Sequence, residues 1–280
     1  MIKKVNFFLN PNAAKDFVSS LKETGFAVIT GGVLPQSLIA EVLKDWTHFF
    51  NGLSPEKKQK YLFDRESQSG FFPMKTEKAK DSKFQDLKEF YHIYKNADLP
   101  AELSPATLTL RDHLLQVAEV LLKWIEQETP VEIRNKFSIC LPDMIQGSSH
   151  NLLRVLHYPA LNGGESQAEI RAAAHEDINL ITLLPAVSSP GLQVKLKTGE
   201  WVDVPSDLNS IVVNVGDMLE EASGGYFKST THQVVNPESG KNVARYSIPL
   251  FVHPRGEVVL SERYTANSFL EERLKQLGLK

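Results

Sequence analysis

The chain has 280 residues, 42% of them hydrophobic, which is enough for a sizeable core in one large domain or two small ones. Its 31 basic and 34 acidic residues are spread along the sequence and leave a net charge of -3, which excludes the basic stretches expected of a nucleic-acid-binding or anionic-membrane-binding protein. A single cysteine, no uninterrupted apolar leader and no apolar run near the ~20 residues that cross a bilayer predict a soluble cytoplasmic protein without a disulfide.

The first half of the chain is predicted to be rich in helices. Residues 25–30 (GFAVIT) form a short apolar run typical of a strand. Helical spacing of apolar residues, or a serine and proline start signal, predicts helices from 35, from 54 and from 104 to about 127. We expect the long third helix to pack across the back of a sheet.

Two stretches of this half are harder to interpret, and its one cysteine carries no obvious chemistry. Residues 63–83 have a mixed pattern and are predicted to form a loop, whereas 86–94 fit either a strand or a short helix. We expect Cys140 to be a small buried hydrophobic residue rather than a nucleophile.

From Leu152 the sequence changes to short strands separated by turn signals. Eight such strands predict a mainly β fold with flanking helices and a cupin-like jelly-roll core. The strands are expected at 152–158, 170–176, 179–184, 191–196, 201–204, 210–215, 228–235 and 243–252. A final helix is expected at 265–277.

The predicted elements fit one domain over residues 1–280. Within it we expect a helix-rich N-terminal region at 1–150, the jelly-roll catalytic core at 151–255 and the C-terminal helix at 256–280. No internal repeat or low-complexity segment interrupts this division.

Three residues in the second half have the character of a metal site. His175 and Asp177 are two apart, so in an extended strand they project from the same face. His232 follows in KSTTHQVVN, a β-branched run of the kind that forms strands. Each residue alone is explained by ordinary hydrogen bonding in a folded core. Together, two histidines and one carboxylate that leave positions open on the ion favour non-haem Fe(II).

Arg245 and Ser247 form a second pair on one strand face, and a guanidinium beside a hydroxyl is suited to holding a carboxylate. Asp217 is interpreted as a turn residue rather than a ligand. Four other histidines lack a partner at ligand spacing and are interpreted as structural or pocket-lining residues: His92, His150, His157 and His253. The apolar and aromatic residues expected near the pocket mouth predict a small, partly apolar substrate: Phe71, Phe72, Tyr91 and Phe251. For Phe71 and Phe72, ordinary packing in the core is an equal alternative.

Several segments resemble the isopenicillin N synthase-like Fe(II)- and 2-oxoglutarate-dependent dioxygenases. HEDINLITLL, GLQV, WVDVP, VVNVGDML, KSTTHQVVNP and RYSIPLF resemble the C-terminal core of that family. GFAVIT, FFNGLSPEKKQKY and GFFP resemble its N-terminal region, so the resemblance extends over nearly the whole chain. It implies a distorted double-stranded β-helix flanked by helices.

The resemblance also implies a set of site residues and cofactors. The iron ligands of the family correspond to His175, Asp177 and His232, and its 2-oxoglutarate clamp corresponds to Arg245 and Ser247, with Tyr158. The implied reaction uses O2 to oxidise a small organic substrate by hydroxylation, desaturation or ring closure, with release of succinate and CO2. Ascorbate would serve as a reductant. Nucleic acid and membranes are not expected partners.

Two departures from the family pattern and three alternatives stay open. Leu156 stands where the family often has asparagine, which removes a polar contact to the co-substrate, and Glu176 replaces a usual threonine at a position expected to point away from the metal. Some relatives keep Arg-x-Ser without using 2-oxoglutarate, so an Fe(II) oxidase of that kind is one alternative. The same three ligands also suit a Zn(II) hydrolase. A cupin-like binding module without turnover is the third alternative.

Overall fold

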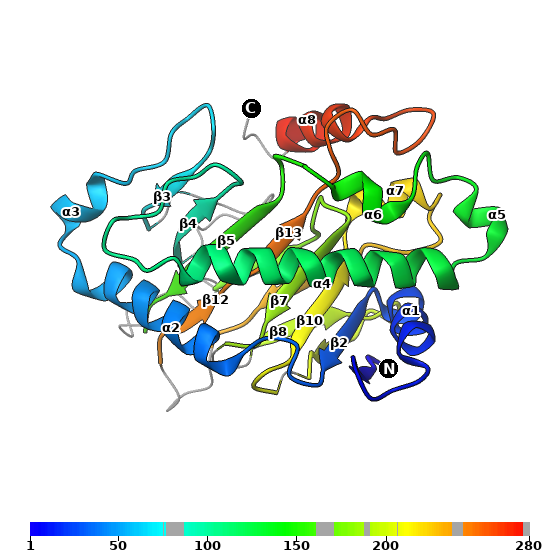
Figure 1. Cartoon of the computed structure of the whole chain (residues 1–280), viewed down its shortest axis with the longest axis horizontal. Coiled ribbons are helices and arrows are strands. Elements are labelled where there is room, and N and C mark those ends of the chain that lie inside the picture. Colours follow the sequence, from blue (N-terminus) through cyan, green and yellow to red (C-terminus); the bar gives the residue numbers. More distant parts are fainter. Residues whose placement is uncertain are drawn as a thin grey trace.

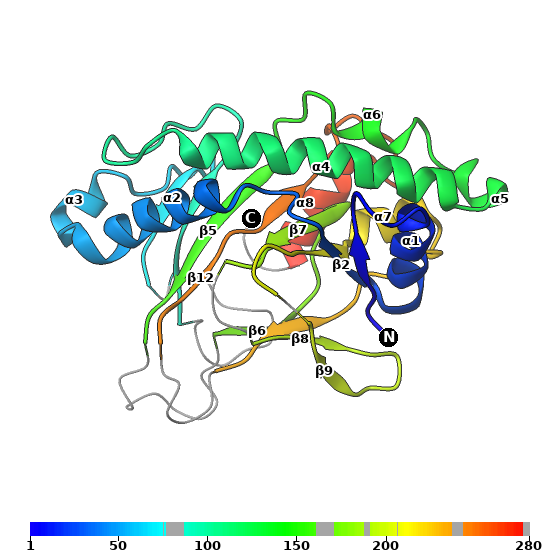
Figure 2. The same cartoon turned by 60° about the horizontal axis from the view of Figure 1, so that its bottom comes forward.

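The computed structural model describes residues 1–74, 76, 87–160, 171–187, 191–205, 207–236 and 243–276. In these residues the strands form two sheets, and helices cover one side of the larger sheet (Figure 1). Turning the molecule shows the smaller sheet below the larger one, with its β6, β8 and β9 labelled (Figure 2). The predicted fold class, mainly β with flanking helices and a jelly-roll core, is confirmed.

The larger sheet combines strands from both halves of the chain. Its strands are, in spatial order, β1 (Lys4–Asn6), β2 (Phe26–Thr30), β10 (Ile211–Val215), β7 (Ile181–Pro185), β13 (Leu250–Val252), β5 (Leu152–Tyr158), β4 (Glu89–Ile93) and β3 (Gly70–Phe72), with β12 (Arg245–Ser247) paired to β5. The N-terminal region therefore supplies four strands of this sheet, and we infer that residues 1–280 form one domain.

The smaller sheet contains four strands in the described residues. They are, in spatial order, β6 (Ala172–His175), β11 (His232–Val234), β8 (Leu192–Lys195) and β9 (Trp201–Asp203). A β-bulge interrupts the pairing of β11 with β6 between His232 and Val234. Such an irregularity changes the direction of side chains at a strand end.

The helices lie mostly on the outer face of the larger sheet. They are α1 (Ala13–Thr24), α2 (Gln36–Thr47), the π-helical turn η1 (His48–Gly52), α3 (Pro55–Gln59), α4 (Ala106–Glu128), α5 (Val131–Arg134), α6 (Leu141–Ile145), α7 (Asp217–Ala222) and α8 (Ala266–Gln276). The predicted stripe of α4 is confirmed, since Leu110, Leu114 and Leu121 are fully buried on the side that faces the sheet. Within the described residues no helix is both long enough and apolar enough to span a bilayer.

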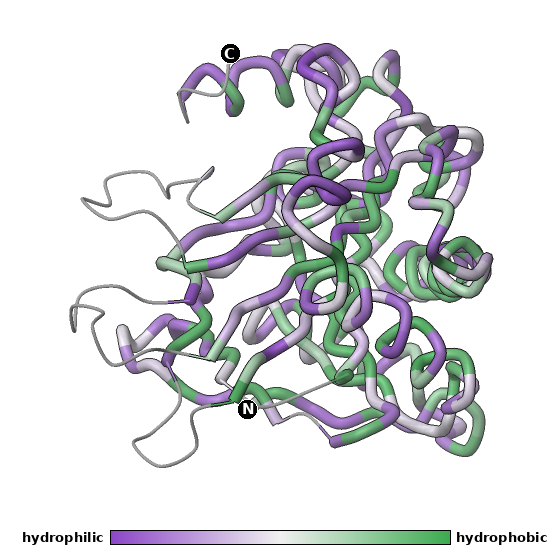
Figure 3. Tube along the Cα trace, turned by 90° about the vertical axis from the view of Figure 1, so that its left-hand side faces the viewer, coloured by the Kyte–Doolittle hydropathy of each residue, from purple (hydrophilic) through white to green (hydrophobic). Residues whose placement is uncertain are grey.

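Side chains of one strand alternate between two separate cores. In β5, Leu153 and Val155 join the core beneath the helices, whereas Leu156 and Tyr158 join a second cluster on the opposite, inner face. This follows from the two-residue period of a strand. The tube coloured by hydropathy shows hydrophobic and hydrophilic residues along the trace of the chain (Figure 3).

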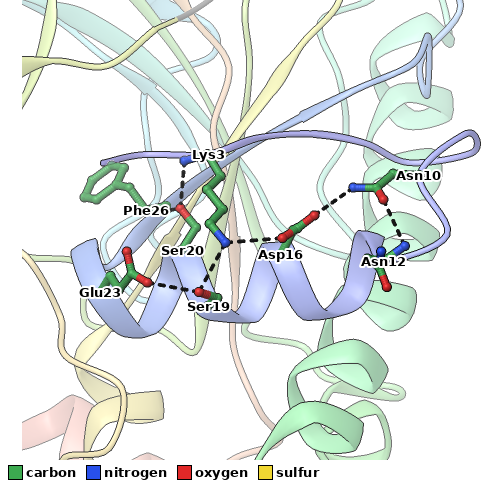
Figure 4. Close-up of polar contacts among 8 residues, drawn as sticks. All are labelled: Lys3, Asn10, Asn12, Asp16, Ser19, Ser20, Glu23 and Phe26. Carbon is green, nitrogen blue, oxygen red and sulfur yellow. Dashed lines mark hydrogen bonds and ion pairs between the residues drawn. The ribbon is translucent and has the colours of Figure 1, made fainter.

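Helix α1 is fixed to the edge of the larger sheet by side-chain hydrogen bonds (Figure 4). Ser20 Oγ donates to Phe26 O at 2.6 Å and accepts from Lys3 N at 3.0 Å, so one hydroxyl links β2 to the segment before β1. Lys3 Nζ lies 3.2 Å from Asp16 Oδ1 on the same helix. These contacts hold Phe26 in place, and its ring packs on the inner face.

Two expectations about local structure need correction, and one open alternative is resolved. The predicted loop at 63–83 contains strand β3, because Phe71 and Phe72 pair with Tyr91 and Phe90 of β4. Residues 86–94, left open above, contain that strand β4. Cys140 is exposed at the start of α6 rather than buried, because the following Leu141 takes the inward position. Residues 75 and 77–83 of the predicted loop lie outside the described residues.

Candidate metal centre

The smaller sheet brings the two predicted histidines together. His175 ends β6 and His232 begins β11, and the antiparallel register places them directly opposite each other. Their ring centroids lie 4.3 Å apart. Asp177 follows β6 by two residues, so that its Oδ1 lies 3.9 Å from His175 Nε2 and 3.8 Å from His232 Nε2.

The hydrogen bonds of the two imidazoles determine which nitrogen faces the carboxylate. His175 Nδ1 lies 2.8 Å from Ala173 O and His232 Nδ1 lies 3.1 Å from Thr230 O. Because a carbonyl oxygen only accepts, each Nδ1 carries the proton and donates it. Each Nε2 is thereby left with a lone pair on the side of Asp177.

The two carboxylate oxygens of Asp177 have different neighbours. Its Oδ2 accepts from Thr182 Oγ1 at 2.5 Å and from Asn214 Nδ2 at 2.8 Å. Oδ1 remains turned toward the two imidazoles. Thr182 lies on β7 and Asn214 opposite it on β10, so the larger sheet orients a ligand that belongs to the loop after β6.

Electrostatics favour an anionic carboxylate beside a neutral imidazole. Burial alone would raise the pKa of Asp177, but His232, His175 and the hydrogen bonds from Thr182 and Asn214 hold it below its usual value. Burial, with His232 beside it, lowers the pKa of His175 to about 4. The His175 side chain is 43% exposed, so one side of this group of residues is accessible.

These three residues suit one divalent cation. The donor atoms lie within 4.8 Å of one another, and no second such group of His, Cys, Asp and Glu is found in the part of the chain that the structure describes. Two donors on one ion, each bound at ~2.1 Å, can lie at most ~4.2 Å apart, and both imidazole-to-carboxylate distances fall below this limit. Two neutral imidazoles and one carboxylate also match the donor set of non-haem Fe(II).

The predicted carboxylate clamp lies on the inner face of the larger sheet. Strand β12 pairs with β5 so that Arg245 is opposite Tyr158 and Ser247 is opposite Leu156. The Arg245 guanidinium carbon lies 5.6 Å from the centroid of the Tyr158 ring, and burial lowers the pKa of Arg245. Leu156 is 6% exposed and places an apolar side chain beside Ser247.

The predicted pocket-lining aromatics divide between the two faces. Phe72 joins the inner cluster, and Phe251 lies opposite Thr182 on the inner face. Phe71 and Tyr91 were wrongly expected at the mouth: both pack on Phe49 beneath the helices, at 5.5 and 5.7 Å between ring centroids. Alternation along β3 and β4 is the reason, since neighbours in a strand point to opposite faces.

The other residues singled out from the sequence lie outside the donor group. Glu176 accepts from Thr231 Oγ1 at 2.8 Å and so points away from the two imidazoles, as expected. Asp217 begins α7, and its pKa is raised to about 6 by burial. His157 is buried on the outer face, where its Nδ1 lies 2.9 Å from Glu89 Oε1.

Sequence reasoning missed several residues of the inner face. Thr182 and Asn214 had no signal beyond their place in apolar strands. Arg154 interrupts the apolar run of β5, and this interruption was the available signal. His253 was left among the structural or pocket-lining residues; burial lowers its pKa to about 4, and it lies near enough to Asp177 for the two charges to interact.

Two family models match the chain. The 2OG-Fe(II) oxygenase superfamily model matches residues 149–254, which include all the residues of the metal group and the clamp. The model described as non-haem dioxygenase in morphine synthesis N-terminal matches residues 9–111.

Solved structures resemble the chain over its whole length. A candidate oxygenase from Shewanella oneidensis is 47% identical with a TM-score of 0.89, covering 100% of this chain and 99% of that one. A full-length protein of Neurospora crassa in complex with alpha-KG, which is 2-oxoglutarate, is 25% identical with a TM-score of 0.81, covering 98% and 96% of the two chains.

Gibberellin 2-beta-dioxygenase 2 of Arabidopsis thaliana is 33% identical over 131 residues, 45% of this chain and 38% of that protein.

Proposed function

Because the chain belongs to the 2OG-Fe(II) oxygenase superfamily and is a 2-oxoglutarate- and Fe(II)-dependent dioxygenase, we propose that it oxidises a small, partly apolar organic substrate at the centre formed by His175, Asp177 and His232. The outcome for the substrate is hydroxylation, desaturation or ring closure. The observation that carries the proposal is the convergence of two Nε2 atoms, each with its Nδ1 donating to a backbone carbonyl, on one oriented carboxylate.

In this proposal the three side chains hold Fe(II), and the chain contributes mainly geometry. Thr182 and Asn214 fix Asp177 through Oδ2, so that Oδ1 is the oxygen offered to iron. Partners of this kind orient a ligand and strengthen metal binding. Bound iron and 2-oxoglutarate supply the activation of O2, with decarboxylation of 2-oxoglutarate to succinate and CO2.

Arg245, Ser247 and Tyr158 are proposed to hold the far carboxylate of 2-oxoglutarate. All three are buried and share the inner face, as the register of β12 with β5 requires. A guanidinium can donate two parallel hydrogen bonds to a carboxylate, and the two hydroxyls can each donate one. Leu156 offers no polar group there, so the clamp depends on these three residues.

The apolar inner cluster is proposed to keep water from the reacting atoms. Phe26 packs edge-on against His232, with 5.6 Å between ring centroids, and is itself fully buried. Expulsion of water strengthens electrostatic interactions inside the site and limits side reactions. A Zn(II) hydrolase would use the same three donors but would give the buried Arg245 and Ser247 no part in the reaction.

Basal succinate release tests the proposal without knowledge of the substrate. With Fe(II), O2, 2-oxoglutarate and ascorbate, the wild-type protein should release succinate above a metal-free control, and Asp177→Ala should not. Asp207→Ala is the matched control, since Asp207 is an exposed carboxylate paired with Lys4 at 2.6 Å. A wild-type protein that binds Fe(II) and 2-oxoglutarate but makes no succinate, alone or with any tested compound, would instead favour a binding module.

A further inference from the structure

We propose that Glu89 and His157 are positioning residues for the 2-oxoglutarate clamp, because they hold β12, the strand of Arg245, from the opposite face of the sheet. The inference rests on the proposed function, since it concerns how the clamp of that same centre is kept in place. Three observations carry it: the strand register behind the clamp, the contacts that fix the His157 ring, and the pairing of β12 with a single strand.

The register of the larger sheet places three side chains in a row on the outer face. His157 of β5 lies opposite Glu89 of β4 on one side and opposite Tyr246 of β12 on the other. Neighbouring residues of a strand point to opposite faces, so Arg245 and Ser247, on either side of Tyr246, project from the inner face. The row Glu89–His157–Tyr246, called the backing row, therefore lies directly behind the proposed clamp.

Both carboxylate oxygens of the buried Glu89 have a partner. Oε2 lies 3.1 Å from Lys58 Nζ, and Oε1 lies 2.9 Å from His157 Nδ1. A carboxylate paired with an ammonium group only accepts, so His157 Nδ1 carries the proton and donates it. Lys58 Nζ also donates to Phe50 O at 3.0 Å. One ammonium group thus fixes both Glu89 and a residue whose ring packs on His157.

The orientation of the His157 ring depends on these neighbours. Its other nitrogen, Nε2, is buried and has no hydrogen-bond partner among the described residues. The ring stacks on Phe50 with 5.2 Å between centroids and on Tyr246 with 4.9 Å, at interplanar angles of 25° and 22°. A rotation of the imidazole would break its hydrogen bond to Glu89 and disturb the stacking on Tyr246 together.

Strand β12 has few other supports. Within the described ranges it pairs with β5 alone, and it is three residues long. Its outer side is held by Tyr246, whose ring stacks on His157 and whose hydroxyl accepts from Asn51 Nδ2 at 2.9 Å. Because Arg245 and Ser247 flank this tyrosine, their position depends on the position of the His157 ring.

The backing row should affect the two ligands of the centre unequally. His175 and His232 belong to the smaller sheet, whose strands do not include β4, β5 or β12. Loosening of the row should therefore weaken the binding of 2-oxoglutarate and leave the binding of Fe(II) unchanged. A general loss of folded structure would weaken both.

Two variants weaken or remove the hydrogen bond between Glu89 and His157. Glu89→Gln removes the charge, and the double variant Lys58→Met/Glu89→Leu replaces both partners of the ion pair with apolar side chains, so that neither charge is left buried alone. 2-Oxoglutarate is titrated into the Fe(II)-loaded protein under anaerobic conditions. We expect both variants to bind it about three- to tenfold more weakly, the equivalent of one lost hydrogen bond. Competition with a chelator should give the wild-type affinity for Fe(II).

Leu21→Ala is the control for lost stability. Leu21 is fully buried under α1, which covers the opposite end of the larger sheet next to β2. This variant should unfold at a lower urea concentration and keep the wild-type affinity for 2-oxoglutarate.

A double-mutant cycle tests whether the backing row acts through the clamp. Glu89→Gln should weaken 2-oxoglutarate binding much less in the Arg245→Ala background than in the wild-type protein, because residues that act together are not additive. Unchanged affinity in both Glu89 variants, an equal loss in Leu21→Ala, or full additivity with Arg245→Ala would overturn the proposal. An unchanged affinity in Arg245→Ala alone would overturn the proposed clamp itself, and this proposal with it.

Discussion

The two faces of the larger sheet use the same strands for opposite purposes. The outer face is covered by helices, and its core contains large apolar and aromatic side chains such as Trp46, Phe49 and Leu121. The inner face presents polar and charged groups between apolar ones: Asn214, Thr182, Arg154, Arg245 and Ser247. Most of these polar residues are as buried as their apolar neighbours.

The degree of burial alone therefore does not distinguish residues that stabilise the fold from residues of the candidate site. A buried polar group costs free energy unless it is hydrogen-bonded or bound to a ligand. On the outer face the apolar side chains lose nothing by burial. On the inner face Thr182 and Asn214 donate hydrogen bonds to Asp177, and these bonds offset the cost of burying the polar groups while they orient a proposed metal ligand.

The described residues of the outer face include a buried charged group. Glu89 lies between Lys58 Nζ, 3.1 Å from its Oε2, and His157 Nδ1, 2.9 Å from its Oε1. The His157 ring is stacked between Phe50 and Tyr246, at 5.2 and 4.9 Å. This group lies behind Tyr158 and Arg245 and links the strands that carry them.

The largest expected effect is a loss of Fe(II) affinity, and it tests the candidate metal group. His232→Ala removes one of three donors and should reduce Fe(II) affinity by more than about a hundredfold, the upper range for loss of a mere orienting partner. The free energy of unfolding of the metal-free protein should change little, because the ligand lies at the end of a strand. Metal analysis and thermal unfolding measure the two quantities.

His48→Ala is the control for this variant, since His48 is an exposed histidine of η1. Full iron occupancy in His232→Ala would remove His232 from the site.

The second prediction tests whether the core on the outer face contributes to stability without affecting iron binding. Trp46 is fully buried, and its Nε1 donates to Thr107 Oγ1 at 3.0 Å. Trp46→Ala should lower the free energy of unfolding by about 3–5 kcal/mol, through lost burial and the cavity left behind. Urea unfolding measures the loss, and the folded variant should bind Fe(II) like the wild type.

Trp201→Ala, at a partly exposed tryptophan of β9, should cost much less. A strong fall in iron affinity in folded Trp46→Ala would break the proposed separation of the two faces.

The third prediction concerns Arg245. A charge-assisted hydrogen-bonding pair contributes about 1.5–3 kcal/mol, so Arg245→Ala should weaken 2-oxoglutarate binding about tenfold to a hundredfold or more. Iron affinity should be spared, because Arg245 lies on β12 of the other sheet. Titration of 2-oxoglutarate into the Fe(II)-loaded protein under anaerobic conditions measures it, with partial rescue expected for Arg245→Lys. An unchanged affinity would place the co-substrate clamp elsewhere.

The smallest effect tests the connection between sheet and metal. Asn214→Leu keeps the size of the side chain but removes its hydrogen bond to Asp177 Oδ2. Iron affinity should fall by about tenfold to a hundredfold. Asn135→Leu, at an exposed asparagine, is the control, and competition with a colorimetric chelator is the measurement. If Asn214→Leu binds iron normally, Thr182 alone orients the carboxylate.

Much of the candidate site could be predicted because its parts are local. His175 and Asp177 fall on one strand face through a two-residue spacing, and Arg245 and Ser247 do the same. The strands themselves were recognised from β-branched runs between turn signals. The long helix α4 was predicted from its apolar stripe for the same local reason.

The failures concern which face a strand presents and what lies beyond it. Phe71 and Tyr91 were assigned to the pocket mouth, but β3 (GFF) and β4 (EFYHI) are buried on both faces, so their sequences do not distinguish the inner face from the outer face. Cys140 was expected to be buried because cysteine usually is, whereas the direction of α6 exposes it.

The sequence by itself indicated the candidate donor residues, the candidate clamp and the alternating pattern of the strands, because these depend on spacing along a few residues. Only the tertiary structure decided that His175 and His232 are directly opposite, that Thr182 and Asn214 hold Asp177, and that Arg154 lies between Phe90 and Phe251. Those facts depend on strand register and sheet order, which pair residues far apart in the chain through hydrogen bonds and packing that no local pattern encodes.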